Sequence, residues 1–296
     1  MHTLKAYYEL TKPGIIYGNA ITAAAGFFVA AAGQVDVVRL VLMLAGLSLV
    51  IASGCVFNNY LDRDLDARME RTRVRPLVTG AVSPSAALWY GALLGVLGVS
   101  ILAFFVNPLS ADIAAIGFVV YVLVYSMWAK RTTPYAAHLG AIAGAVPPVV
   151  GYVSVAGALD MAALALFLML CFWQMPHFFA IAVYRAEDYR AAGVPALPLL
   201  RSARETYLQM LGYALAFIAA SALLYWFGYE NVPYLVAVLA LGVAWLAVIV
   251  PGARTTDAPR KARRVFLTSL IVLLGVSLSM AIFARRPALA GAMDAA

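Results

Sequence analysis

The chain has 296 residues, of which 64% are apolar and only 12% are charged, about half the charged share of an ordinary soluble domain. This composition excludes a soluble globule and an intrinsically disordered chain. The formal net charge of +7 would suit nucleic-acid binding, but the lysines and arginines lie in short segments between long apolar runs. The sequence therefore predicts a protein of the lipid bilayer, with no nucleic acid as a partner.

Charge-free runs long enough to cross a hydrocarbon core of about 30 Å occur nine times along the chain. They predict an all-α, polytopic membrane protein that forms a single transmembrane domain over residues 1–296. The predicted spans are residues 14–33, 40–58, 85–106, 113–129, 137–156, 161–183, 207–228, 232–252 and 265–284.

The lysines and arginines indicate how the spans are oriented. With nine spans, all but three of the 21 basic residues fall on the side of the N-terminus, and the exceptions are Arg39, Arg285 and Arg286. Because cytoplasmic loops carry the excess of positive charge, we expect a cytoplasmic N-terminus. Two connections on that side, residues 59–84 and 184–206, are long and polar, and loops of this kind often carry function.

The first of these loops begins with a pattern of oxygen-bearing side chains. Asn58, Asp62 and Asp66 stand four residues apart, so they form one stripe if the second span continues inward as a helix. Carboxylate and amide oxygens suit Mg²⁺, whose other positions go to water and phosphate, and nearby arginines suit phosphate oxygens. The alternative is a solvated helix end whose charges obey the positive-inside rule.

The second loop carries Glu187 and Asp188. Four spans separate the two loops, so both acidic segments emerge on the same side and could hold a diphosphate between them through Mg²⁺. An amphipathic loop with a Gly-Pro turn is the alternative.

A histidine lies inside the sixth span, in the segment Trp173-Gln174-Met175-Pro176-His177. A helix that continued beyond His177 would place Tyr184 and Asp188 on the same face, toward the acidic loop. An ionisable group inside a span is a candidate for function, here as a haem ligand or a proton acceptor. Packing against a neighbouring helix is the alternative.

The fifth span contains small residues and two prolines over residues 143–152. Such a segment is tolerated where neighbouring helices or a cavity satisfy the freed backbone groups. We therefore expect a bent helix that lines a cavity.

Together these segments resemble the UbiA-type intramembrane prenyltransferase superfamily, and within it the branch that farnesylates haem. The resemblance covers nearly the whole chain. It rests on residues 10–14, on 53–60 followed by Asp62-Arg63-Asp64, on 69–72, 119–121 and Lys130-Arg131, on Pro147-Pro148 with Gly151-Tyr152, on 173–177, and on Asp188-Tyr189 with Pro195-x-Leu197-Pro198.

The resemblance implies nine transmembrane helices around a central cavity, with Mg²⁺ and farnesyl diphosphate at its cytoplasmic end. It implies Asp62, Asp66 and Asp188 as the metal-binding and catalytic carboxylates. Quinone prenyltransferases of the superfamily usually have a second pair of aspartates, whereas this chain has Tyr184 in place of the first of them. The diphosphate is expected to be bound by Asn58, Arg63, Arg71, Arg75, Lys130, Arg131 and Arg185.

The activity that the resemblance implies is transfer of a farnesyl group from farnesyl diphosphate to a vinyl group of haem B, with addition of water, giving haem O. His177 would contact the haem. The setting would be a bacterial inner membrane, with a terminal oxidase or the next haem-modifying enzyme as receiver. Three alternatives stay open: a quinone-type aromatic prenyltransferase, a secondary transporter and a structural assembly factor. Against transport, the acids lie at the rim of the spans rather than in the middle.

Overall fold

Nine helices long and apolar enough to span a membrane follow one another in the part of the chain that the computed structural model describes, residues 2–254 and 258–286. The nine predicted spans are therefore confirmed. The elements are α1 (His2–Leu10), α2 (Pro13–Ala31), α3 (Val37–Leu61), α4 (Arg63–Asp66), α5 (Pro84–Phe105), α6 (Pro108–Val119), η1 (Val120–Ala129), α7 (Lys130–Thr132), α8 (Ala136–Gly144), α9 (Val146–Ala156), α10 (Met161–Tyr184), α11 (Ala186–Ala192), η2 (Leu197–Leu199), α12 (Ala203–Trp226), α13 (Val232–Ile249), η3 (Val250–Arg254) and α14 (Ala258–Phe283).

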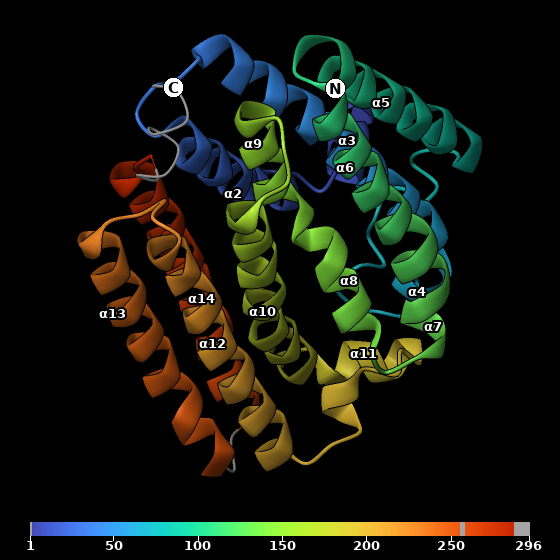
Figure 1. The fold of residues 1–296 in the computed structure, drawn as a ribbon. Helices are drawn as coiled ribbons and strands as arrows, with labels where there is room; N and C mark the ends of the chain where they lie inside the picture. Colours follow the sequence, from blue (N-terminus) through green and yellow to red (C-terminus); the bar gives the residue numbers. More distant parts are fainter. Residues whose placement is uncertain (1, 255–257, 287–296) are drawn as a thin grey trace.

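The long helices form one bundle, and the short helices α4, α7 and α11 lie together at one end of it (Figure 1). We call this end, which carries the connections 62–83, 133–135 and 185–202, the motif end. Helix α14 packs against both α10 and α2, and so links the C-terminal helices to the N-terminal ones.

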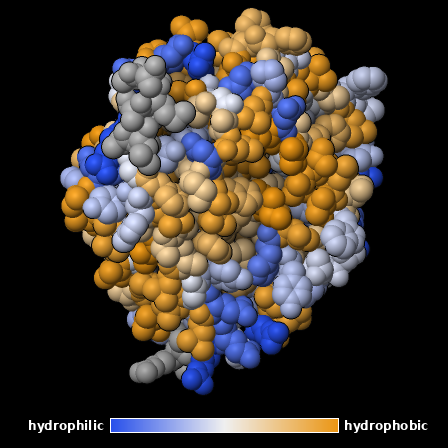
Figure 2. All heavy atoms as spheres, in the orientation of Figure 1, coloured by the Kyte–Doolittle hydropathy of each residue, from blue (hydrophilic) through white to orange (hydrophobic). Residues whose placement is uncertain are grey.

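Apolar side chains cover the outside of the bundle as well as its core. In Figure 2, hydrophobic residues occupy most of the middle of the visible face, and hydrophilic residues gather at its lower end. Trp89, Phe104 and Trp226 are among the large apolar side chains that are more than two thirds exposed. Because water does not favour such a surface, these residues face lipid, and the chain is a multi-pass membrane protein.

The fifth span is interrupted, as its small residues and prolines predict. Helix α8 ends at Gly144, and α9 starts at Val146 with Pro147 in its first turn. A side chain from α10 packs against the break, since Gln174 Nε2 donates at 3.0 Å to Ala141 O, which also accepts from Ala145 N. The expected bent helix is thus confirmed.

Two glycines allow α2 and α9 to lie in backbone contact. A Cβ atom added at Gly26 would overlap the carbonyl oxygen of Pro148, and one added at Gly151 would overlap that of Ala23. Small residues at such crossings are the usual means by which helices pack closely in membranes. Because α9 lines the centre of the bundle, this contact also sets the position of the cavity wall.

We expect Gly151→Ala to destabilise the protein by about 1–3 kcal/mol, because the added methyl group meets a backbone atom and not a movable side chain. Gly212→Ala in α12 is the matched control, since a Cβ atom there meets nothing within 4 Å. It should leave stability unchanged or raise it by less than about 1 kcal/mol. Thermal unfolding in detergent measures both, and equal melting temperatures would show that the α2–α9 contact is not tight.

Candidate functional site

The carboxylate motif lies where α3 meets α4. Helix α3 ends at Leu61, and Asp62 (φ −86°, ψ 0°) joins it to α4. Backbone hydrogen bonds nevertheless continue with four-residue spacing, from Asp62 N to Asn58 O at 2.9 Å and from Asp66 N to Asp62 O at 2.8 Å. The expected helical spacing of the three side chains is therefore preserved through the junction.

Asp62 is buried, with 1% exposure, and is held by side chains from two other segments. Its Oδ2 atom accepts hydrogen bonds from Asn58 Nδ2 at 2.9 Å and from Lys130 Nζ at 2.5 Å. Asn58 Nδ2 also donates to Ser126 Oγ at 2.9 Å. The other carboxylate oxygen, Oδ1, is buried without any hydrogen-bond partner. A buried oxygen of this kind normally has a partner, so it is the natural position for an added ligand.

Asp66 has 3% exposure and is paired with Arg75, whose guanidinium lies 2.6 Å from Asp66 Oδ2. Thr72 also stabilises the backbone at Asp66, since its hydroxyl donates to Asp66 O at 3.0 Å. The loop after α4 therefore folds back over the motif and brings Arg75 to it.

Two charged residues of the motif face outward instead. Asp64, half exposed, forms a bidentate pair with Arg131, and this guanidinium lowers the pKa of Asp64 to about 2. Arg63 is exposed, donates to Tyr60 O at 2.6 Å and lies over the Tyr60 ring. Neither pair contacts Asp62 or Asp66, so Arg63 and Arg131 reach the site only if their side chains move.

The second loop packs against the first, as the parity of the spans predicts. Leu65 and Met69 form a small buried cluster with Ala192 of α11. Tyr189, also on α11, has its pKa raised to about 12 by burial and by the nearby Tyr125, while Lys130 and Arg71 act in the opposite direction. The two loops thus meet near Lys130.

The acidic residues of the second loop are less buried than those of the first. Asp188 is partly buried, and Glu187 is exposed. Arg185 lies over the Tyr184 ring, 4.7 Å from its centre. Among the described residues, no three histidine, cysteine or acidic side chains form a group that could hold a metal ion by themselves.

The residues present nevertheless fit Mg²⁺. This ion commonly takes one or two carboxylates and completes its shell with water and substrate phosphate. Asp62, with its unpartnered Oδ1, and Asp66 supply two such groups.

A π-helix leads to Ser126 and Lys130, and the sequence reading missed the role of Ser126. Residues Val120–Ala129 follow this wider winding, and Ser126 Oγ donates to Tyr121 O five residues earlier at 2.8 Å. Tyr121 and Tyr125 stack, with ring centres 5.8 Å apart and planes inclined by 13°. π-Helical turns are rare and often occur at functional sites. Here the π-helix places Ser126 and Lys130 against Asn58 and Asp62.

Lys12 is the second residue whose role the sequence reading missed. It lies at the α1–α2 junction in the left-handed conformation (φ 52°, ψ 67°), and its ammonium donates to Asn58 Oδ1. Burial and the charge of Arg75 lower the pKa of Lys12 to about 8. The sequence offered one signal, a lysine directly before Pro-Gly at the start of a span, and positive-inside topology already accounted for it.

A cavity of about 410 Å³ occupies the centre of the bundle beside these residues. Its walls are mostly apolar, and polar side chains interrupt them at only a few positions. Six segments contribute: Gly14–Thr22 of α2, Leu47–Cys55 of α3, Ala114–Tyr125 of α6 and η1, Gly140–Pro147 of α8 and α9, Leu170–Phe178 of α10, and Leu270–Leu273 of α14.

His177 lines this cavity and does not point along a continuous helix to the acidic loop. Helix α10 ends at Tyr184, and Arg185 (φ −110°, ψ 28°) separates it from α11. The expected continuation of the His177 face to Asp188 is therefore wrong, whereas His177 and Tyr184 do lie seven residues apart in one helix. His177 instead stacks on Trp173, with ring centres 4.7 Å apart. Its Nδ1 atom lies 2.7 Å from Ser269 Oγ of α14.

The hydrogen bonds of Ser269 decide which nitrogen of His177 carries the proton. The Ser269 hydroxyl has one proton and donates it to Phe266 O at 2.6 Å. Ser269 must therefore accept from His177 Nδ1–H, which leaves the lone pair on Nε2. A neutral imidazole oriented in this way is the usual form of a histidine that binds a metal centre.

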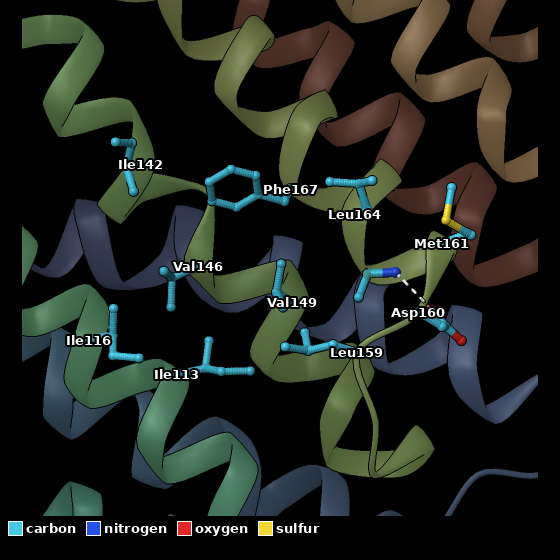
Figure 3. A pocket seen from close by; sticks show the side chains of 11 residues that line it. Ile113, Ile116, Ile142, Val146, Val149, Leu159, Asp160, Met161, Leu164 and Phe167 are labelled. Atoms are coloured by element: carbon cyan, nitrogen blue, oxygen red, sulfur yellow. Dashed lines mark hydrogen bonds between the residues drawn. The ribbon is translucent and has the colours of Figure 1, made fainter.

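A second, more open pocket of about 610 Å³ lies toward the opposite end of the bundle. Figure 3 shows its lining, which is apolar apart from Asp160. The carboxylate of Asp160 is fully engaged, because it caps α10 and accepts from Tyr152 and Tyr229. None of the predicted catalytic, diphosphate-binding or haem-binding residues lines this pocket, whereas His177 lines the central cavity, which is therefore the candidate site.

The fold and the site together define an intramembrane enzyme with a carboxylate and cation cluster at the mouth of an apolar cavity. A model of the UbiA prenyltransferase family matches residues 19–271. The chain belongs to this family and is a prenyltransferase.

Curated relatives match over nearly their whole length. The chain is 48% identical to protoheme IX farnesyltransferase of Acinetobacter baylyi, over 96% of this chain and 98% of the relative. It is 44% identical to protoheme IX farnesyltransferase 2 of Pseudomonas fluorescens, over 96% and 97%.

Solved structures share the fold at low sequence identity. A digeranylgeranylglyceryl phosphate synthase has a TM-score of 0.77 at 20% identity and covers 96% of this chain and 100% of its own. A UbiA homologue from Archaeoglobus fulgidus, bound to GPP and Mg²⁺, has a TM-score of 0.64 at 16% identity over 94% and 99%.

Proposed function

We propose that the chain transfers the farnesyl group of farnesyl diphosphate to a vinyl group of protohaem IX, with Mg²⁺ as cofactor and addition of water, giving haem O. The observation that carries the donor half of this proposal is the buried, unpartnered Asp62 Oδ1, in a motif bound by Lys12, Lys130 and Arg75 beside an apolar cavity. The names and near-complete coverage of the curated relatives support the acceptor half.

The carboxylates of Asp62 and Asp66 would hold Mg²⁺, with Asp188 entering from the second loop. When bound, the ion would supply positive charge that neutralises the leaving diphosphate. Lys130 and Arg75 already lie within hydrogen-bond distance of the two carboxylates and would bind diphosphate oxygens. The other expected contacts come from Asn58, Arg63, Arg71, Arg131 and Arg185.

Ionisation of the donor would break the allylic C–O bond, with the electron pair leaving on the diphosphate. Cations fixed around the leaving group favour this step because the charge develops where they already stand. The farnesyl carbon then bonds to the terminal vinyl carbon of haem B. Water adds to the other vinyl carbon, next to the macrocycle, and releases a proton.

The apolar cavity would hold the isoprenoid chain and the haem. Its walls exclude water, so the reactive carbon meets the vinyl group before solvent does. His177 Nε2 would contact the haem iron, since the hydrogen bond to Ser269 leaves its lone pair free on the cavity side.

The proposed setting is a bacterial inner membrane, with the motif end in the cytoplasm and residues 1–296 forming one domain. Support comes from topology: the motif-end segments of the chain carry nearly all of its lysines and arginines. The product would pass to a terminal oxidase or to the next haem-modifying enzyme.

The activity is tested by incubating purified protein in detergent with haem B, farnesyl diphosphate and Mg²⁺. Chromatography and mass spectrometry of the extracted haems should show a haem heavier by one farnesyl group and one hydroxyl group. A chelator should abolish the product. Unmodified haem together with a prenylated 4-hydroxybenzoate or naphthoate would contradict the haem acceptor and keep the donor site.

We expect Asp62→Asn and Asp66→Asn each to lower turnover by two orders of magnitude or more, roughly the loss seen when a charge-stabilising group is removed. Asp64→Asn is the matched control from the same motif. Because its pair with Arg131 is on the surface, it should change turnover by no more than about twofold. Full activity of Asp62→Asn would contradict the metal assignment.

We expect His177→Ala to weaken haem binding and to shift the visible absorption band of bound haem, because the iron loses a nitrogen ligand. His138→Ala is the matched control, since His138 does not line the central cavity. A titration of each variant with haem, followed by absorption, measures both effects. An unchanged affinity and spectrum in His177→Ala would show that the ring only packs against Trp173 and Ser269.

A further inference from the structure

Asp62 and Asp66, the two buried carboxylates of the motif, each form an ion pair with a basic side chain of the protein. Lys130 Nζ lies 2.5 Å from Asp62 Oδ2, and an Arg75 nitrogen lies 2.6 Å from Asp66 Oδ2. The two acids are 1% and 3% exposed, so these pairs are poorly screened by solvent. A metal ion that approaches Asp62 or Asp66 must therefore compete with a positive charge already in place.

Lys12 adds a third cation to the same cluster. In the described part of the chain its ammonium has no carboxylate partner and donates only to Asn58 Oδ1. Asn58 in turn donates to Asp62 Oδ2, which also accepts from Lys130 Nζ. Lys12 and Lys130 are therefore linked through the hydrogen-bonded pair Asn58–Asp62. Lys12, Lys130 and Arg75 are thus three cations bound to a motif with two buried carboxylates, Asp62 and Asp66. The excess positive charge favours a polyanion over a lone metal ion.

The backbone conformation of Lys12 also supports a role in ligand binding. A lysine in the left-handed region (φ 52°) has a strained backbone. Such strain persists where the surrounding structure fixes the residue, and strained residues cluster at ligand-binding and active sites. The following turn of α2 is open toward the cavity, because a Cβ atom at Gly14 or Gly18 would meet nothing within 4 Å. Lys12 therefore lies two residues before Gly14, where the lining of the cavity begins.

We propose that the metal ion and the prenyl diphosphate bind as one unit by an exchange of cations. Lys130 and Arg75 leave the carboxylates of Asp62 and Asp66 for the diphosphate oxygens, and the metal takes the unpartnered Asp62 Oδ1 together with the carboxylate oxygens that they release. Lys12 leaves Asn58 for the diphosphate in the same way. This inference rests on the proposed function, because it requires a prenyl diphosphate as donor.

The exchange has two consequences for binding. The metal and the diphosphate must raise each other's affinity by the same factor, because the coupling of two ligands is reciprocal. Removing the charge of Lys130 must also act in opposite directions on the two ligands. Metal alone binds more tightly because its competitor is gone, whereas the diphosphate binds more weakly because it has lost a partner.

The experiment measures Mn²⁺ binding to the purified full-length protein in detergent by the electron paramagnetic resonance signal of free Mn²⁺. Farnesyl thiodiphosphate, which resists ionisation, replaces the donor. We expect this analogue to tighten Mn²⁺ binding about tenfold or more, within the usual range of such couplings. In Lys130→Gln, Mn²⁺ alone should bind several-fold more tightly than in the wild type, and the enhancement by the analogue should shrink.

Two variants serve as controls. Lys5→Gln removes a positive charge from an exposed pair with Glu9 and should leave Mn²⁺ binding unchanged. Lys130→Arg keeps the charge and should keep the coupling. Where Lys130→Gln does not fold, Arg75→Gln makes the same prediction through Asp66.

The proposal is overturned if Mn²⁺ binds the wild type equally well with and without the analogue, or if Lys130→Gln weakens the binding of Mn²⁺ alone. Direct binding of labelled analogue separates this outcome from failure of the proposed function. An analogue that binds without coupling to Mn²⁺ contradicts the exchange only. An analogue that does not bind the wild type contradicts the prenyl diphosphate donor as well.

Discussion

Asp62 is a charged group with 1% exposure at the end of a membrane-spanning helix, and such a group is stable only where other segments supply partners. The partners are Asn58 from its own helix and Lys130 from the segment that follows the π-helix, with Lys12 bound to Asn58 from the N-terminal junction. These three attachments draw α2, α3 and η1 together at one end of the bundle. The position of the cavity mouth follows from them.

Irregular backbone is concentrated around the same cavity. The π-helix, the break between α8 and α9 and the left-handed Lys12 all occur in elements that line it. Within a bilayer such irregularities are tolerated where protein groups pack against them, and Gln174 donates to Ala141 O next to the break. Apart from the left-handed Ala32 at the end of α2, these irregularities lie where an enzyme needs special side-chain positions, while the lipid-facing helices α5 and α13 are uninterrupted.

The cavity has two chemically different sides. Near the motif end, cations and carboxylates suit a charged leaving group, and deeper in the bundle Trp173, His177 and Ser269 join α10 to α14 in a largely apolar wall. This separation places polar recognition at the mouth and apolar contact inside. A substrate with a charged head and a long hydrocarbon tail can satisfy both sides at once, which matches the chemistry of the UbiA prenyltransferase family.

The sequence by itself determined the nine spans, because charge-free runs of about 20 residues have few alternatives to a membrane helix. It also determined the spacing of Asn58, Asp62 and Asp66, since hydrogen bonds four residues apart continue through the junction at Asp62. Only the tertiary structure decided that α10 stops at Tyr184, so that His177 turns to the cavity and Ser269 instead of the acidic loop. Residues far apart in the chain, such as Lys12 and Asn58, meet through helix packing, and local patterns carry no record of which helices will be neighbours.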